Sequence, residues 1–359
     1  MSRKPKVPLR RGWTTGACAA GAALAAFEAL ETGTFPDPVS IRLPKGERPF
    51  FVLTRKNLAD GAATAGIVKD AGDDPDVTHG VTVLVTVRRN IPGTGIIFYA
   101  GDGVGTVMKP GLPVAPGEPA INPGPRNMIA DVLLDSAEAL DVMADLDVTI
   151  AIPGGEEIAK KTWNPRLGIV GGLSILGTTG IVHPYSCSAW IHSIHQGIDV
   201  ARATGVDHVA GVTGKTSEAA IGKMYGLDEG ALIDMGDFVG GMLKYMRRYP
   251  IERLTVGGGF AKMVKLAQGN LDLHSARSQV DFKQLAQWLS DLGAKPDNVA
   301  RAAQANTAAQ VLISAGNIEI GDLVARRARE VALATLSGRT AVEIVIVDRN
   351  GTVVGRAGG

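Results

Sequence analysis

The chain has 359 residues, of which 45% are hydrophobic and 20% charged, and its formal net charge is +1. This length allows two domains, and the balanced charge gives no sign of binding to nucleic acid or to a membrane surface. The two cysteines, Cys18 and Cys187, indicate no disulfide scaffold and are typical of a cytoplasmic protein. No stretch approaches the roughly 20 apolar residues of a membrane span.

The first part of the chain predicts an α+β domain, residues 1–145, with an alanine-rich helix and an acidic loop. Thr14 or Thr15 is a suitable N-cap for a helix that runs to about residue 30, with Gly33 shortly after its end. Strands are expected at residues 39–43, 50–54, 81–88 and 95–99, and a helix at 126–139. Residues 141–147 are interpreted as the domain boundary.

From residue 146 to 359, buried-type strands alternate with helices, which predicts a Rossmann-like, three-layer α/β domain with a mainly parallel sheet. The expected strands are residues 148–152, 173–176, 208–212 and 254–256. Helices are expected at 187–204, 216–225, 236–248, 282–292, 297–315 and 320–336. Asn350 and Gly351 lie between two valine-rich runs and predict a hairpin with a type I′ turn.

Each of the four expected strands is followed by glycines and small polar residues, at 153–156, 177–180, 213–216 and 257–260. In an open parallel sheet these segments would share the carboxyl edge, where ligands bind. Glycine lets a ligand approach the backbone, and the helix that follows offers free N–H groups. One such segment alone is often glycine-rich for steric reasons, but four together predict a ligand-binding edge.

The spacing of these glycines does not identify the ligand. Residues 211–216 are two residues short of a P-loop, and G-x-G-x-x-G is absent after every expected strand of this domain. The run GDGVG at 101–105 is not followed by a helix pattern, so a dinucleotide site is not expected there. S-adenosylmethionine fits segments of this kind, but spacing alone does not favour it over other nucleotides.

The most concentrated polar segment is KDAGDDPDVTHG at residues 69–80, directly before the clearest strand. Its spacing does not fit a calcium loop. Two interpretations stay open. The aspartates form a solvated turn that caps backbone N–H groups, or a carboxylate and the imidazole face a cleft between the domains for proton transfer.

Other polar residues give weaker signals. His183, His192 and His195 lie near one another in sequence but are interpreted as ordinary histidines, and no metal site is predicted. Cys18 is interpreted as a small residue packed within the alanine-rich helix. Lys215 and Lys262 become partners for substrate carboxylates if the glycine-rich segments line one cleft.

Long motifs along nearly the whole chain resemble the cobalt-precorrin-5B C1-methyltransferase (CbiD) family of cobalamin biosynthesis. They are RGWTTGACAA (11–20), residues 69–80, GDGVGTV (101–107), KPGL (109–112), INPGPR (121–126), IPGGEEIAKKT (152–162), NPRLGI (164–169), ILGTTGIV (175–182) and GGFAKM (258–263). One stretch, residues 185–192, is more aromatic and less acidic than the family pattern.

This resemblance implies methyl transfer from S-adenosylmethionine to C1 of cobalt-precorrin-5B, giving cobalt-precorrin-6A, with cobalt only as part of the substrate. The electron-rich ring carbon is itself the nucleophile, so no protein nucleophile is required. Catalysis then consists mainly of aligning this carbon with the sulfonium methyl group. The residues expected to act fall into three roles. A base is expected among Asp74, Asp76 and His79; the cofactor at Gly177, Thr178, Thr179, Gly180, Gly257, Gly258 and Gly259; and the tetrapyrrole at Thr14, Thr15, Arg166, Lys215 and Lys262.

Two other functions stay open from the sequence: a nucleotide-dependent enzyme that uses residues 211–216, and a non-catalytic corrinoid carrier. The sequence leaves open whether the substrate already holds cobalt, and whether the chain forms a homo-oligomer.

Overall fold

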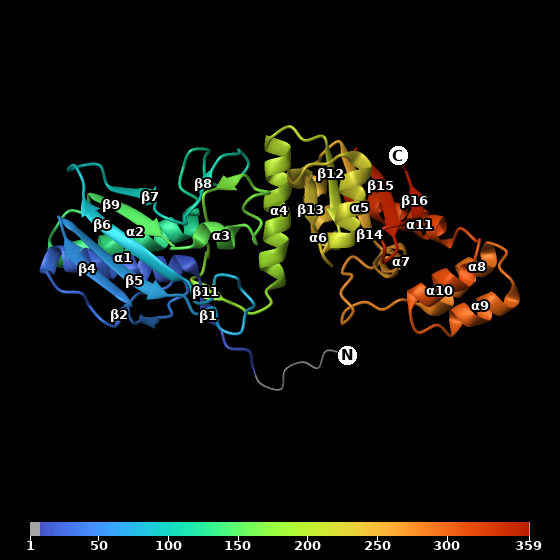
Figure 1. Cartoon of the computed structure of the whole chain (residues 1–359), viewed down its shortest axis with the longest axis horizontal. Helices are drawn as coiled ribbons and strands as arrows, with labels where there is room; N and C mark the ends of the chain where they lie inside the picture. The colour runs from blue at the N-terminus through green and yellow to red at the C-terminus, as the bar shows by residue number, and fades with distance from the viewer. Residues whose placement is uncertain (1–7, 359) are drawn as a thin grey trace. The chain divides into compact units, whose positions relative to one another are not determined.

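The computed structural model describes residues 8–358, which form two compact units, 8–186 and 187–358 (Figure 1). The predicted boundary at residue 145 is therefore wrong. Strand β9 (Leu146–Ala151) pairs with β6 (Thr82–Arg89) and β7 (Ile96–Ala100) inside the sheet of the first unit. A buried strand has the same local pattern in either sheet, so the pattern of residues 146–151 could not reveal its partners.

The first unit contains a five-stranded sheet in the order β4-β5-β6-β9-β7, antiparallel except between β7 and β9. Two of the sheet strands not yet delimited are β4 (Arg55–Ala59) and β5 (Ala62–Val68). The elements outside this sheet are β1 (Gly12–Trp13), α1 (Thr15–Thr32), β2 (Val39–Ser40), β3 (Phe50–Phe51), β8 (Thr106–Val107), α2 (Pro123–Leu140), α3 (Gly155–Ala159), β10 (Ile169–Val170) and β11 (Ile181–Val182). The mixed α/β fold of the chain agrees with the predicted class.

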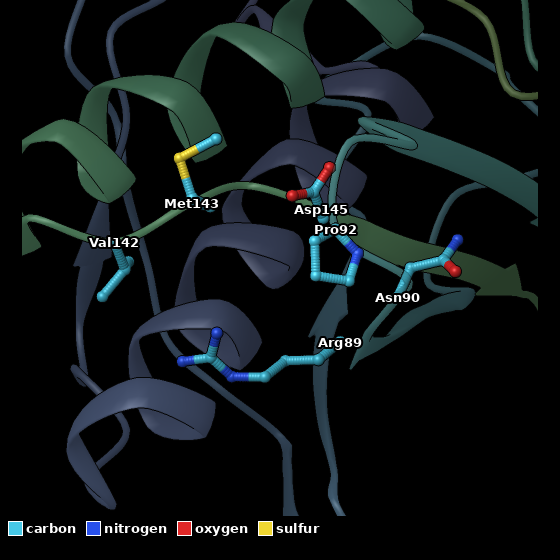
Figure 2. A pocket seen from close by; sticks show the side chains of 6 residues that line it. All are labelled: Arg89, Asn90, Pro92, Val142, Met143 and Asp145. Carbon is cyan, nitrogen blue, oxygen red and sulfur yellow. The ribbon is translucent and has the colours of Figure 1, made fainter.

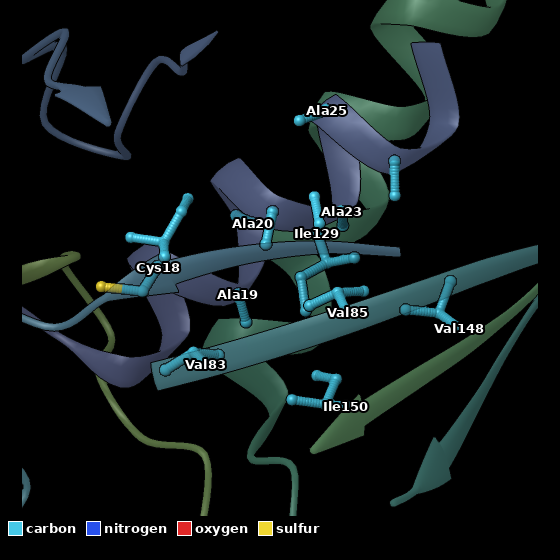
Figure 3. Packing of buried hydrophobic residues seen from close by; sticks show 14 of the residues in the cluster. Cys18, Ala19, Ala20, Ala23, Ala25, Val83, Val85, Ile129, Val148 and Ile150 are labelled. Atoms are coloured by element: carbon cyan, nitrogen blue, oxygen red, sulfur yellow. The ribbon is translucent and has the colours of Figure 1, made fainter. Parts of the chain in front are cut away.

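Helix α1 forms the centre of this unit, as its composition predicts. Thr14 caps its N-terminus by accepting from the Ala17 N–H, and Gly33 ends it in the left-handed conformation. Thirteen of its 18 residues are buried, because small side chains let the helix pack closely against β5, β6 and α2. Figure 3 shows its alanines above Val83 and Val85 of β6, whose alternating residues face the core.

The hairpin of β4 and β5 was not predicted, although the sequence carries a signal for it. Asp60 and Gly61 form its turn, and both have positive φ angles, 53° and 68°. An Asp-Gly pair between strands is typical of a type I′ turn. The flanking residues 55–59 are exposed and charged at their start, so the hydrophobic pattern did not mark them as a strand.

The predicted strand at residues 173–176 is wrong. Leu173 and Ile175 make only isolated parallel bridges, to Val104 and Ile121. The expected strands at 39–43 and 50–54 shorten to the two-residue pair β2 and β3.

The second unit is built on one five-stranded sheet. Its elements are α4 (Cys187–Ala203), β12 (His208–Val212), α5 (Lys215–Tyr225), the 3-10 helix η1 (Glu229–Ala231), β13 (Leu232–Asp234), α6 (Val239–Arg248), β14 (Arg253–Gly259), α7 (Phe260–Ala267), α8 (Phe282–Asp291), α9 (Pro296–Ala303), α10 (Ala308–Ala315), α11 (Ile320–Leu336), β15 (Ala341–Val347) and β16 (Val353–Ala357).

The strand order is β13-β12-β14-β15-β16, parallel throughout except for β16. The chain leaves β12 toward one side of the sheet and leaves β14 toward the other, so the order reverses between these two strands. Right-handed crossovers place α5 on one face and α6, α7 and α11 on the other, where α11 contacts both α6 and α7. This arrangement agrees with the predicted Rossmann-like, three-layer unit.

The C-terminal hairpin exists as predicted, but its turn is not type I′. The Asp348 N–H donates to the Thr352 carbonyl and closes the turn. Of the predicted turn residues Asn350 and Gly351, only Gly351 has a positive φ angle, 84°, whereas a type I′ turn requires positive φ angles at both central residues. A register shift next to Val347 accommodates the extra residues. No helix within residues 8–358 is long and apolar enough to cross a membrane.

Candidate functional site

The four glycine-rich segments do not share one edge, contrary to the prediction. Residues 153–156 and 177–180 belong to the first unit, whereas 213–216 and 257–260 follow or end β12 and β14 of the second. The prediction placed all four strands in one sheet, and two of them are not part of it.

The segment 177–180 packs against the start of α1. The Thr14 N–H donates to the Gly180 carbonyl at 3.0 Å, and the Gly16 N–H donates to the Leu176 carbonyl at 2.9 Å. A Cβ at Gly177, whose φ angle is 119°, would overlap the Thr14 side chain. This close approach explains the glycine without a ligand. Thr178 remains exposed.

Thr14 and Thr15, which were expected to bind substrate, are both buried. The Thr14 hydroxyl accepts from the Ala17 N–H at 3.1 Å. The Thr15 hydroxyl lies 3.0 Å from the Leu176 N atom, which donates to it. Both hydroxyls therefore hold the N-terminus of α1 and the neighbouring chain in place.

The acidic segment, residues 69–80, is fastened to residues 10–13. Arg10 forms an ion pair with Asp70, and the Arg10 N–H donates to Asp73 at 2.6 Å. The Trp13 N–H donates to the Asp70 carbonyl at 2.7 Å. The Arg10 guanidinium lowers the pKa of Asp70 to about 2.

Lys69 anchors the segment from inside. Its side chain is 2% exposed, and its ammonium group donates to the Asp76 carboxylate and, at 2.7 Å, to the Thr78 hydroxyl. The pKa of Asp76 is lowered: burial acts to raise it, but the Lys69 charge and the hydrogen bonds from Lys69 and Thr78 together outweigh burial. A carboxylate stabilised in its charged form is a weak proton acceptor.

In this segment His79 is exposed and Asp74 is half-buried. Asp74 accepts from the Tyr185 N–H at 2.7 Å. The Ala71 N–H donates to His79 Nδ1 at 3.1 Å, which places the proton of the neutral imidazole on Nε2. Of the three expected bases, His79 is exposed, Asp74 accepts from a backbone N–H, and Asp76 is engaged by Lys69.

In the second unit, Gly257 to Gly259 are the last residues of β14, not a loop. A Cβ at Gly257 would overlap Ile221 of α5, and one at Gly258 would lie 2.7 Å from Thr213 Oγ1. A Cβ at Gly259 would meet no described atom within 4 Å. Packing therefore explains the first two glycines, and only Gly259 lies in open space.

Three chain segments meet beyond the ends of β12, β13 and β14. The Lys262 ammonium, on α7, donates to the Thr213 carbonyl at 3.0 Å and lies 3.1 Å from Asp237 Oδ1. The Thr213 N–H donates to the Gly257 carbonyl at 3.0 Å. Lys262 was expected to bind substrate, but here it joins the three segments into one edge.

The end of β13 carries residues that the sequence analysis did not select. Asp234 pairs in register with Val212 of β12, and its Oδ1 atom accepts from the Gly236 N–H at 3.1 Å. The Trp190 indole N–H, on α4, donates to the Asp234 carbonyl at 3.1 Å. A short apolar pair followed by an acid, LID at 232–234, is the only sequence signal for this strand.

The two remaining expected substrate contacts lie in different units. Lys215 is exposed on the first turn of α5, next to the second-unit edge. Arg166 is in the first unit, with its guanidinium 5.6 Å from the centre of the Trp163 ring.

The other polar candidates have local partners. His195 stacks on Tyr245 with 3.8 Å between ring centres. Cys18 is buried, and burial raises the pKa of its thiol to about 12. No group of three or more His, Cys, Asp or Glu side chains within residues 8–358 is arranged to hold a metal.

A pocket of about 380 Å³ opens in the first unit, lined by Arg89, Asn90, Pro92, Val142, Met143 and Asp145 (Figure 2). Its polar groups have structural partners. Arg89 pairs with Glu31, and Asp145 accepts from the Gly95 N–H at 2.7 Å. No expected site residue lines it.

Comparisons with known proteins cover nearly the whole chain. The CbiD family model matches residues 2–184, and the model for the CbiD C-terminal domain matches residues 272–358. A cobalt-precorrin-5B C(1)-methyltransferase of Brucella anthropi is 58% identical over 98% of this chain and 96% of its own length. The cobalt-precorrin-5B C(1)-methyltransferase of Paramagnetospirillum magneticum is 58% identical over 97% of this chain and 98% of its own length. A crystal structure of a cobalamin biosynthesis protein (cbiD) from Archaeoglobus fulgidus has 27% identity and a TM-score of 0.41, covering 75% of this chain and 83% of that one.

Proposed function

Because this chain belongs to the CbiD family, we infer that it transfers a methyl group from S-adenosylmethionine to carbon C1 of cobalt-precorrin-5B. The observation that carries this inference is 58% identity over nearly the full length of relatives with that name. Cobalt enters only as part of the substrate. The resemblance found in the sequence motifs is thereby confirmed.

We place the cofactor at the second-unit edge formed by residues 213–216 and 257–262. The strand order reverses between β12 and β14, and ligands of open α/β sheets bind beyond the carboxyl ends of strands at such a point. Helices α5 and α7 both begin here after a glycine, so their first N–H groups face the edge without a side-chain cap. These groups and the exposed Lys215 suit the carboxylate of the methionine part.

We assign the tetrapyrrole to the first unit, at the acidic segment and the exposed Thr178. The substrate's carboxylates need donors, and the His79 Nε2–H is one on this surface. Asp74 and His79 are the groups we assign to proton transfer. The ion pair with Lys69 supports a structural role for Asp76.

The test is incubation of the purified chain with isotopically labelled S-adenosylmethionine and either cobalt-precorrin-5B or the metal-free ring. Mass analysis should find one labelled methyl group on the cobalt substrate. A coloured complex that gains no methyl group would instead favour a corrinoid carrier, and binding of ATP but not of the methyl donor would favour a nucleotide-dependent enzyme.

Asp74→Asn, Asp76→Asn and His79→Ala should be compared in the same assay. We expect a large loss of turnover for the first or third variant and a smaller loss for Asp76→Asn. Near-normal rates for all three would make the acidic segment purely structural.

Both cysteines are free, which supports a cytoplasmic location for this reaction.

A further inference from the structure

The strand β13 ends in a carboxylate at the edge where we place the cofactor. Asp234 is paired in register with Val212, so it lies directly beside the start of the 213–216 turn. The Met235 N–H donates to the Val212 carbonyl at 2.9 Å, which continues the pairing past the end of the strand. The acid and the turn are thus neighbours on one edge.

Spacing along the chain gives this acid a chemical meaning. Asp234 follows Gly214, the residue before α5, by 20 positions, in a β12-α5-β13 unit with both strands parallel. In nucleotide-binding units of this topology, an acid about 20 residues after the glycine turn accepts from the ribose hydroxyl groups.

The turn itself lacks the rest of the dinucleotide pattern. G-x-G-x-x-G and the P-loop both need additional glycines to cradle phosphates, and residues 211–216 supply neither arrangement. Gly211 lies within β12, where a Cβ would overlap Met242, so its role is packing. The edge therefore has a group for a ribose and no cradle for a diphosphate.

An aromatic ring is fastened to the same short segment. Trp190 donates to the Asp234 carbonyl, and its ring centre lies 6.4 Å from that of Phe238. The residue is nevertheless 44% exposed. An exposed indole held by two contacts can cover a flat heterocycle without a further loss of side-chain freedom.

We propose that Asp234 and Trp190 bind the adenosine half of S-adenosylmethionine, Asp234 accepting from the ribose hydroxyl groups and Trp190 contacting the adenine ring. This rests on the proposed function and adds the residues that select a nucleoside without a diphosphate. Lys262 is a positioning residue here, because it holds the 213 and 237 segments together.

The test measures binding to the full chain by calorimetry, with S-adenosylhomocysteine and its 2′-deoxy analogue as probes. Asp234→Asn should weaken S-adenosylhomocysteine about tenfold to a hundredfold, the range for a lost hydrogen bond to a charged group, and should weaken the deoxy analogue much less. Asp228→Asn is the matched control, an exposed aspartate before the other end of β13. It should bind both probes as the wild type does.

Trp190→Phe should keep most of the affinity for S-adenosylhomocysteine, and Trp190→Ala should lose about tenfold or more. The wild-type chain supplies a measurement that needs no variant, since it should itself prefer S-adenosylhomocysteine to the 2′-deoxy analogue. Equal affinity of the wild type for both probes would overturn the ribose assignment, as would equal losses for both probes in Asp234→Asn.

The outcomes separate this inference from the proposed function. If the wild type transfers methyl groups while Asp234→Asn binds S-adenosylhomocysteine normally, only the adenosine assignment fails. If the wild type neither binds this probe nor methylates cobalt-precorrin-5B, both fail.

Discussion

Replacement of Lys69 by methionine tests how the acidic segment is held. The substitution keeps most of the length of the side chain but removes the ammonium group that pairs with Asp76 and Thr78. Breaking a buried ion pair by removing one partner costs about 3–5 kcal/mol. We expect about 3 kcal/mol, the lower end, because Asp76 is 26% exposed and still accepts from the Thr78 N–H at 2.8 Å.

The assay is urea unfolding followed by circular dichroism, together with hydrogen exchange of the first-unit amides. Exchange assigns the loss to the unit that contains the substitution. A loss of about 3 kcal/mol corresponds to roughly a hundredfold change in the unfolding equilibrium. Amides of residues 70–80 should lose the most protection.

The double variant Lys69→Met with Asp76→Asn is the control. It removes both charges, so it should be more stable than Lys69→Met alone, and the two changes should not be additive. A loss of less than about 0.5 kcal/mol for Lys69→Met, the range of ordinary surface substitutions, would refute the reasoning, as would simple additivity.

Three further outcomes follow from packing and charge. Gly257→Ala should cost about 1–3 kcal/mol of stability by forcing α5 away from β14, whereas Gly259→Ala, whose methyl group meets open space, should change urea unfolding little. Arg10→Gln should be less stable than the wild type at pH 5, and the difference should shrink from about pH 4 toward pH 2. The lowered pKa of Asp70 stabilises the fold at pH values above the pKa that Asp70 has in the unfolded chain, and this contribution is lost as the pH falls. A difference in stability that grows in acid would contradict this. Iodoacetamide at pH 8 should leave Cys18 unmodified in the native chain, since burial raises the pKa of its thiol to about 12, and mass analysis should find it labelled only after unfolding.

Sequence patterns predicted the local features of this fold well. The limits and caps of α1 follow from its alanines, Thr14 and Gly33. The strands β6, β12 and β15 and the parallel second-unit sheet also agree with expectation. These features depend on neighbouring residues, whose spacing is visible in one dimension.

The predictions that failed depend on partners distant in sequence. Residues 146–151 pair with β6 and β7, a choice that their own pattern does not encode. Gly257 and Gly258 were interpreted as a loop because glycine is common there, yet they are strand residues that give space to Ile221 and Thr213. Asp234 was missed because β13 has only three residues, too few for a periodic signal.

The pairing of β14 with β15 has a consequence for synthesis of the chain. Arg253 of β14 is in register with Ala341 of β15, and the helices α7 to α11 lie between these strands in sequence. A ribosome therefore releases β12, β13 and β14 well before the strand that covers the open side of β14 exists. Such pairing is slow and leaves an apolar strand edge exposed meanwhile. We therefore expect the second unit to need chaperones and to aggregate when expression is fast.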